Sequence, residues 1–147
     1  YEILRCLVGS EMCIRDRGCT LTSEALEAEH RRRGFRTTGY HYYIRRDGTV
    51  LGTRSLELPG AHCRGHNKYS IGICYEGGLD ARGNPKDTRT PEQRSALHLL
   101  VYQLLQQFRN ARVCGHRDLS PDLDGDGTVE PWEWVKQCPC FEVSKEF

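Results

Sequence analysis

The sequence has little net charge, no long apolar run and only one methionine. Its 21 Lys and Arg residues against 20 Asp and Glu residues leave a formal net charge of +1, so nothing points to a nucleic acid or an anionic membrane as partner. No apolar stretch approaches the about 20 residues of a membrane-spanning helix. Residues 1–17 also lack the basic start and apolar stretch of a signal peptide. We therefore expect one globular domain with no nucleic-acid partner and no membrane insertion.

The eight cysteines allow two interpretations. In a secreted protein they would suggest a disulfide framework. Several of them, however, lie inside apolar runs such as SIGICYE and ARVCGH, where a free cysteine is a common small core residue. We expect mostly reduced thiols.

Local patterns predict an alternation of helices and strands. A capped start and a glycine stop indicate a helix over 21–35, and the Asp47–Gly48 pair indicates a β-hairpin over 40–51. A buried strand is expected over 70–78, a helix capped by Thr90 over 90–108, and a strand over 111–116. This order predicts an α/β fold, with a central mixed β-sheet flanked by helices.

Two residues near the C-terminus could form half of a zinc site. His116 follows the last predicted strand in CGHRD, and Cys138 lies in KQCPCFE. Catalytic zinc usually takes three protein ligands and keeps a fourth position for water. Taken alone, the pair is weak evidence, because a core cysteine and a surface histidine are the commoner arrangement.

Several blocks together resemble a known family. GYHYYIRRDGTV, GAHCRGHNKYSIGICYEGG, TPEQ, GHRD and KQCPCF occur in this order over residues 18–143. They resemble the zinc-dependent N-acetylmuramoyl-L-alanine amidases of the phage-lysozyme and peptidoglycan-recognition-protein type. The resemblance implies that fold, with peptidoglycan as partner. It also implies hydrolysis of the amide between the lactyl group of muramic acid and L-alanine.

The resemblance also implies roles for individual residues. It makes His116 and Cys138 zinc ligands, Tyr40 and Lys136 catalytic residues that stabilise the oxyanion, and His62 and Asn67 substrate-binding residues. Structural alternatives stay open for each: a strand aromatic for Tyr40, a solvated helix residue for Lys136, and plain loop residues for His62, His66 and Asn67. We expect His30 and His41 to be structural.

An acidic insertion, LSPDLDGDGTVEPWEW, separates GHRD from KQCPCF. Residues 122–133 match D-x-[DN]-x-[DN]-G-x5-E in full, the pattern of an EF-hand calcium loop. The pattern makes calcium ligands of Asp122, Asp124, Asp126, Thr128 and Glu133. We expect a bound Ca²⁺ that fixes the segment delivering Lys136 and Cys138. The alternative is an acidic surface loop that ends in a short helix, EPWEWVKQ.

The third zinc ligand of the family is absent from the sequence. It is a histidine in an HCSAT-like block at the end of the first strand, and the family spacing from Tyr40 places it near Glu11. No histidine occurs before His30. Residues 1–17, YEILRCLVGSEMCIRDR, back-translate to a transposon-based sequencing adapter in frame, with its variable index giving LRC. We therefore expect 1–17 to be a non-native segment and 18–147 to be the amidase domain. ILRCLV is apolar enough to occupy the strand position.

Three functions follow from these features. The first is a zinc amidase of phage, prophage or bacterial origin that degrades the cell wall, such as an endolysin, with weak or no activity in this chain. The second is a non-catalytic peptidoglycan-binding module, and the third is a calcium-regulated interaction domain. A monomer is expected in each case, and the sequence leaves the localisation open.

Overall fold

The computed structural model describes residues 5–11, 28 and 39–147, and its centre is a five-stranded sheet. The spatial order is β3-β2-β4-β1-β5. Strands β2 and β3 are antiparallel, whereas β4 runs parallel to β2 and β1, and β1 runs parallel to β5. The strands are β1 (Arg5–Glu11), β2 (Tyr42–Ile44), β3 (Val50–Gly52), β4 (Ser70–Glu76) and β5 (Arg112–Gly115). The predicted α/β fold with a mixed sheet is confirmed.

The predicted hairpin is confirmed as β2 and β3, paired with Tyr43 opposite Leu51. The Arg45 amide donates to the Thr49 carbonyl at 2.9 Å, and the Thr49 amide donates to Asp47 Oδ1 at 2.9 Å. Gly48 has φ 86°, a conformation that glycine adopts without steric cost. The Asp-Gly pair therefore sets the turn.

Strand β4 is buried along its whole length, as its apolar sequence predicts. A 3-10 turn, η1 (Asn67–Tyr69), leads into it. Gly77 and Gly78 follow with φ 138° and 104°, so the strand ends where only glycine fits easily. Parallel neighbours on both sides explain a run without polar alternation.

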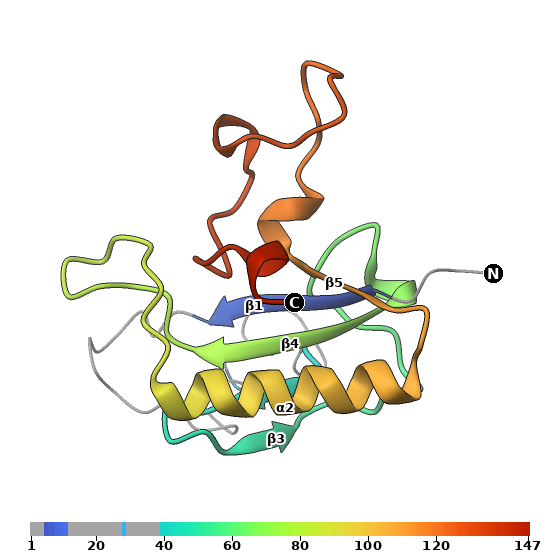
Figure 1. The fold of residues 1–147 in the computed structure, drawn as a ribbon, viewed down its shortest axis with the longest axis vertical. Coiled ribbons are helices and arrows are strands. Elements are labelled where there is room, and N and C mark those ends of the chain that lie inside the picture. The colour runs from blue at the N-terminus through green and yellow to red at the C-terminus, as the bar shows by residue number, and fades with distance from the viewer. Residues whose placement is uncertain (1–4, 12–27, 29–38) are drawn as a thin grey trace.

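Helix α2 (Pro91–Gln107) covers one face of the sheet (Figure 1). Thr90 Oγ1 accepts from the Gln93 amide at 3.1 Å, and Gln93 Oε1 accepts from the Thr90 amide at 3.0 Å, which completes a capping box. The buried stripe packs on β2 and β4 in one core cluster that includes Leu97, Leu100, Val101, Leu104, Ile44, Ile71, Ile73 and Tyr75. The predicted helix and its apolar face are confirmed. None of the helices in the described ranges has the length and apolarity to cross a bilayer.

Strand β1 lies between β4 and β5. Val8 is opposite Gly115 of β5, and Glu11 is opposite Glu76 at the end of β4. Residues 5–11 thus form a strand that overlaps ILRCLV, residues 3–8, where the sequence predicts one. The helix predicted over 21–35 lies outside the described residues, except for Ala28, which is helical.

The chain after β5 is irregular. It forms η2 (His116–Leu119) and η3 (Pro131–Glu133), and ends near η4 (Val143–Lys145). Between η2 and Cys138, residues 120–137 project beyond the sheet (Figure 1); we call this segment the arm. The arm contains only the three-residue turn η3, so the short helix considered over EPWEWVKQ is not formed.

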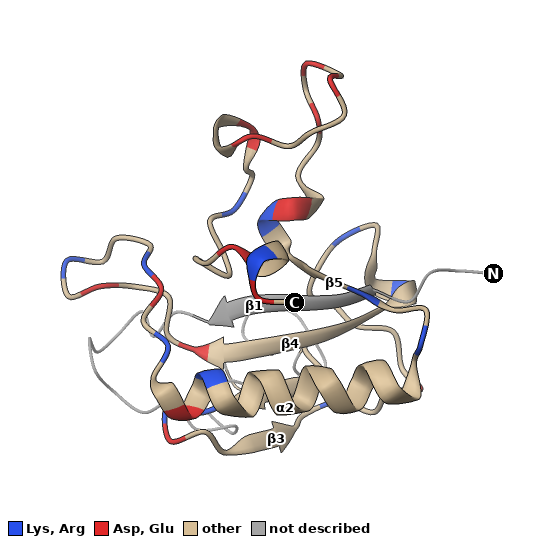
Figure 2. Cartoon of the chain, in the orientation of Figure 1, with Lys and Arg blue, Asp and Glu red and all other residues tan. Residues whose placement is uncertain are grey.

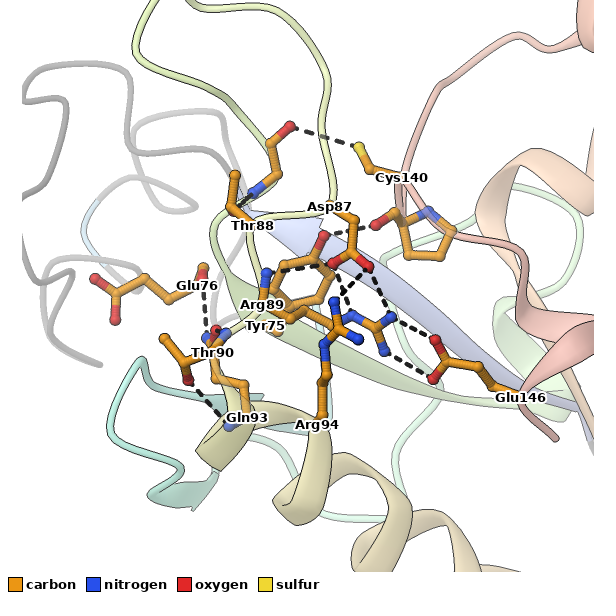
Figure 3. A network of polar contacts seen from close by, with 12 residues as sticks. Tyr75, Glu76, Asp87, Thr88, Arg89, Thr90, Gln93, Arg94, Cys140 and Glu146 are labelled. Carbon is orange, nitrogen blue, oxygen red and sulfur yellow. Dashed lines mark hydrogen bonds and ion pairs between the residues drawn. The ribbon is translucent and has the colours of Figure 1, made fainter.

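The segment that follows Cys138 is anchored to the sheet and to the start of α2 (Figure 3). Tyr75 Oη donates to the Pro139 carbonyl at 2.6 Å. Arg89 is buried, lies on the Phe141 ring, and binds the carboxylates of Asp87 and Glu146 at 2.9 Å. These contacts fix the backbone on the C-terminal side of Cys138.

Candidate functional site

The site begins where β5 ends. Gly115 lies so close to Pro139 that a Cβ atom on it would be 2.5 Å from the proline Cδ, so the strand end and the CPC turn approach directly. The Arg117 amide donates to the Cys138 carbonyl at 3.0 Å. As a result His116 Nδ1 lies 3.1 Å from Cys138 Sγ, and both residues are buried.

Two further rings pack on this pair. The centroid of the His62 ring lies 6.0 Å from that of His116 and 5.7 Å from that of Tyr40, and both pairs are nearly parallel. Tyr40 lies 5.9 Å from His116. The three rings thus form a buried cluster next to Cys138.

Two glycines make the slot that holds the His62 ring. A Cβ atom at Gly72 would lie 2.5 Å from His62 Cδ2, and one at Gly60 would also overlap the ring. Ser70 Oγ lies 3.3 Å from His62 Nε2, whereas Nδ1 is buried without a hydrogen-bond partner in the described part of the chain. Gly72 lies in the predicted buried strand, whereas nothing in the sequence distinguishes Gly60 from a turn glycine.

His62 and His116 are both neutral at pH 7. Burial, together with a smaller contribution from the positive charge of Lys136, lowers the pKa of His116 to about 4. Burial also lowers the pKa of His62 to about 3, with a smaller contribution from His116. A neutral imidazole has the lone pair that a metal ligand needs.

The His116–Cys138 pair fits a zinc ion. Zn–N and Zn–S bonds of about 2.05 and 2.3 Å at a tetrahedral angle separate the two ligand atoms by about 3.6 Å. The observed 3.1 Å is a hydrogen-bond distance, so metal binding requires the atoms to move apart by only about half an ångström. Strand β1 continues past Val8, the partner of Gly115, to Glu11. The family spacing places the third zinc ligand near Glu11, and the sequence has no histidine there.

The other residues predicted for the site lie at differing depths around the His116–Cys138 pair. Tyr40 is buried in the ring cluster, and Lys136 is exposed on the returning part of the arm. Asn67 Oδ1 accepts from the amides of His62 and Cys63 at 2.9 and 2.8 Å, so this oxygen shapes the loop that carries His62.

His41 has a structural position, as expected. It is 1% exposed, with Nδ1 accepting from the Gly72 amide at 3.0 Å and Nε2 lying 2.8 Å from the Leu58 carbonyl. His30 lies outside the described residues. No disulfide bond joins the five cysteines in the described part of the chain to one another, and reduced thiols throughout the protein stay a prediction.

The arm carries the acidic loop of residues 122–133, and Figure 2 shows its acidic residues near the tip. One carboxylate oxygen from each of Asp122, Asp124 and Asp126 lies within 4.8 Å of the others, and the same holds for Asp124, Glu130 and Glu133. Glu133 is 3% exposed and accepts from the Leu123 and Glu130 amides at 2.6 and 2.9 Å. Gly127 has φ 93° at the position where the EF-hand pattern requires a sharp turn.

A family model described as N-acetylmuramoyl-L-alanine amidase matches residues 13–139, which include every residue of the site. The chain belongs to this family. An uncharacterised protein of Haemophilus influenzae is 47% identical to this amidase-family chain over 97 residues, covering 66% of the chain and 84% of the relative. The endolysin of Enterobacteria phage K11 is 36% identical over 116 residues, covering 79% of the chain and 68% of the endolysin.

Solved structures show the same fold. The N-acetylmuramoyl-L-alanine amidase LysC from Clostridium intestinale superposes with a TM-score of 0.73 at 24% identity, over 99% of this chain and 82% of that one. Bumblebee PGRP-SA superposes with a TM-score of 0.70 at 19% identity, over 99% and 80%. The fold is therefore that of the amidases and peptidoglycan-recognition proteins.

Proposed function

We propose that the native protein is a zinc-dependent amidase that cleaves the bond between N-acetylmuramic acid and L-alanine in peptidoglycan. The observation that carries the proposal is the buried His116–Cys138 pair, with ligand atoms 3.1 Å apart, in a chain of the amidase family. Similarity to phage endolysins supports a role in degrading cell walls. We also propose that it acts as a monomer, which light scattering can test.

Each residue of the site has a distinct role in this proposal. His116 Nδ1 and Cys138 Sγ hold the zinc, which when bound polarises a carbonyl and lowers the pKa of water. The Lys136 ammonium stabilises the negative charge that develops on the scissile carbonyl oxygen, and the Tyr40 phenol donates a hydrogen bond to it. His62 and Asn67 bind the substrate beside them.

The proposal includes a non-native N-terminal segment. Residues 1–17 derive from adapter DNA and stand where the family has its first strand and third zinc ligand, while 18–147 form the amidase domain. Two ligands bind zinc less well than three, so this chain has weak or no activity. Sequencing the gene upstream of codon 18 tests this: a native strand that ends in histidine supports it, and an authentic YEILRCLVGSEMCIRDR contradicts it.

We further propose that residues 122–133 bind Ca²⁺ and that the ion stabilises the arm. The support is the full EF-hand spacing together with the gathering of its carboxylates within 4.8 Å. A calcium titration followed by melting temperature tests the site. An unchanged melting temperature at millimolar calcium would refute it.

A binding module without catalysis is the second candidate. It is favoured by the absence of a histidine before His30 and by similarity to a peptidoglycan-recognition protein of Drosophila melanogaster, 31% identical over 104 residues. Assays of binding to purified cell walls and of their clearing distinguish the two candidates. Co-sedimentation without clearing, even after an HCTAT-like strand replaces residues 1–17, supports the binding module; zinc-dependent clearing by the restored protein supports the amidase. A calcium-regulated interaction domain would bind calcium but not cell walls.

A further inference from the structure

Arg117 lies between the arm and the C-terminal segment. Its guanidinium carbon is 4.1 Å from the centroid of the Trp134 ring, and Nη2 donates to Glu142 Oε2 at 3.1 Å. The side chain is 9% exposed, although it carries a full charge. A buried guanidinium stacked on a tryptophan is a strong, geometrically defined contact.

The turn η2, which contains Arg117, and the residue that follows it, Ser120, hold the base of the arm at two points. Ser120 Oγ accepts from the Val135 amide at 3.0 Å, and the Arg117 amide donates to the Cys138 carbonyl at 3.0 Å. Lys136 and Gln137 lie between these two points in sequence. The path of the returning chain, from Trp134 to Cys138, is therefore set by η2.

The two tryptophans of the arm differ sharply. Trp134 packs against Arg117, whereas Trp132, two residues earlier, is 63% exposed. An arm without an effect on the site would not require a buried cation such as Arg117, or the aromatic ring of Trp134 that packs on it. Because Arg117 directly follows His116 and Trp134 precedes Cys138 on the same short segment, this stack joins the two chain segments that carry the ligand atoms.

We propose that Arg117 and Trp134 are positioning residues that hold Cys138 Sγ against His116 Nδ1 and so set the zinc affinity of the site. The inference rests on the proposed zinc site. Residues that orient metal ligands from outside typically change metal affinity by about 10- to 100-fold when they are replaced. The contact between Arg117 and Trp134 does so here by fixing the path of the segment that leads to Cys138.

The test compares Trp134→Leu with Trp132→Leu in the full chain, with zinc affinity measured by competition with a chromophoric chelator. We expect Trp134→Leu to bind zinc about tenfold more weakly than Trp132→Leu. Trp134→Phe, which keeps a ring for Arg117, should recover most of the loss. With Co²⁺ in place of zinc, the thiolate absorption band should weaken in Trp134→Leu only.

Each outcome decides a different claim. Equal zinc affinities for Trp134→Leu and Trp132→Leu overturn the positioning role while leaving the zinc site intact. If the unaltered chain takes up no zinc, the same variants are compared in the protein in which an HCTAT-like strand replaces residues 1–17. No zinc uptake by that protein overturns the zinc site and the positioning role together. If Trp134→Leu does not fold, Arg117→Lys decides against the exposed control Arg82→Lys: a severalfold weaker affinity supports the inference, and an equal affinity overturns it.

Discussion

Adding one methyl group at Gly72 is expected to destabilise the protein through His62. Gly72 lies inside β4 with an ordinary strand conformation, so alanine meets no backbone strain there. Its Cβ would lie 2.5 Å from His62 Cδ2 and 2.8 Å from Cγ. Carbon atoms in contact lie about 3.5 Å apart, so the ring must move by about 1 Å.

The ring has little room to move. Tyr40 stacks on it at 5.7 Å, while His116 and His41 both lie 6.0 Å away. Overpacking of this kind costs about 1–3 kcal/mol. For a chain of this size the melting temperature should fall by about 3–10 °C.

Thermal unfolding of four variants checks the reasoning. Gly52→Ala, in β3, is the matched control because nothing lies within 4 Å of its added Cβ atom. In a His62→Ala background, Gly72→Ala should cost less than about 0.5 kcal/mol, since the clashing ring is gone. A Gly72→Ala variant as stable as Gly52→Ala, or an undiminished cost without the His62 ring, would show that the slot is wrongly assigned.

Three further predictions concern metals and pH. Cys138→Ser should lose bound zinc by elemental analysis while Cys140→Ser retains it; equal zinc content in both excludes Cys138 as a ligand. Calcium at 100 times its dissociation constant should stabilise the chain by about 2.7 kcal/mol, and Glu133→Gln should abolish this shift, whereas a shift retained in that variant contradicts the loop assignment. In chelator-treated protein the folded pKa values of His62 and His116, about 3 and about 4, lie below the ordinary 6.5. The unfolded state therefore binds more protons below pH 6.5, and the unfolding free energy should fall by up to about 2 kcal/mol per histidine between pH 7 and 5 but stay flat above pH 7. Urea titrations across this range measure it, and a profile flat down to pH 5 contradicts it.

The elements predicted from sequence are those whose signals are local. The Asp47–Gly48 turn, the Thr90 cap and the apolar run of β4 each act within a few residues, and the structure has all three. Residues 130–137 looked compatible with a helix, yet the backbone there is held by Ser120 and Arg117 from another part of the chain. Tertiary contacts override a weak helical preference.

The candidate site was likewise predicted only in part from the sequence. The blocks GHRD and KQCPCF indicated His116 and Cys138 as a pair, and the structure brings His116 Nδ1 and Cys138 Sγ to 3.1 Å. Neither the slot formed by Gly60 and Gly72 nor the stack of Arg117 on Trp134 was foreseen, because both depend on contacts between segments far apart in sequence. Glycines in a buried strand are the one signal that could have indicated the slot.

The most direct test is mass spectrometry of purified peptidoglycan digested by the protein in which an HCTAT-like strand replaces residues 1–17, with zinc and with a chelator. The proposed amidase should release stem peptides that begin with a free L-alanine amino group, leaving glycan strands with intact lactyl groups, only when zinc is present. A restored protein that binds one zinc ion and the cell wall, yet releases no such peptides, would contradict the proposed amidase activity.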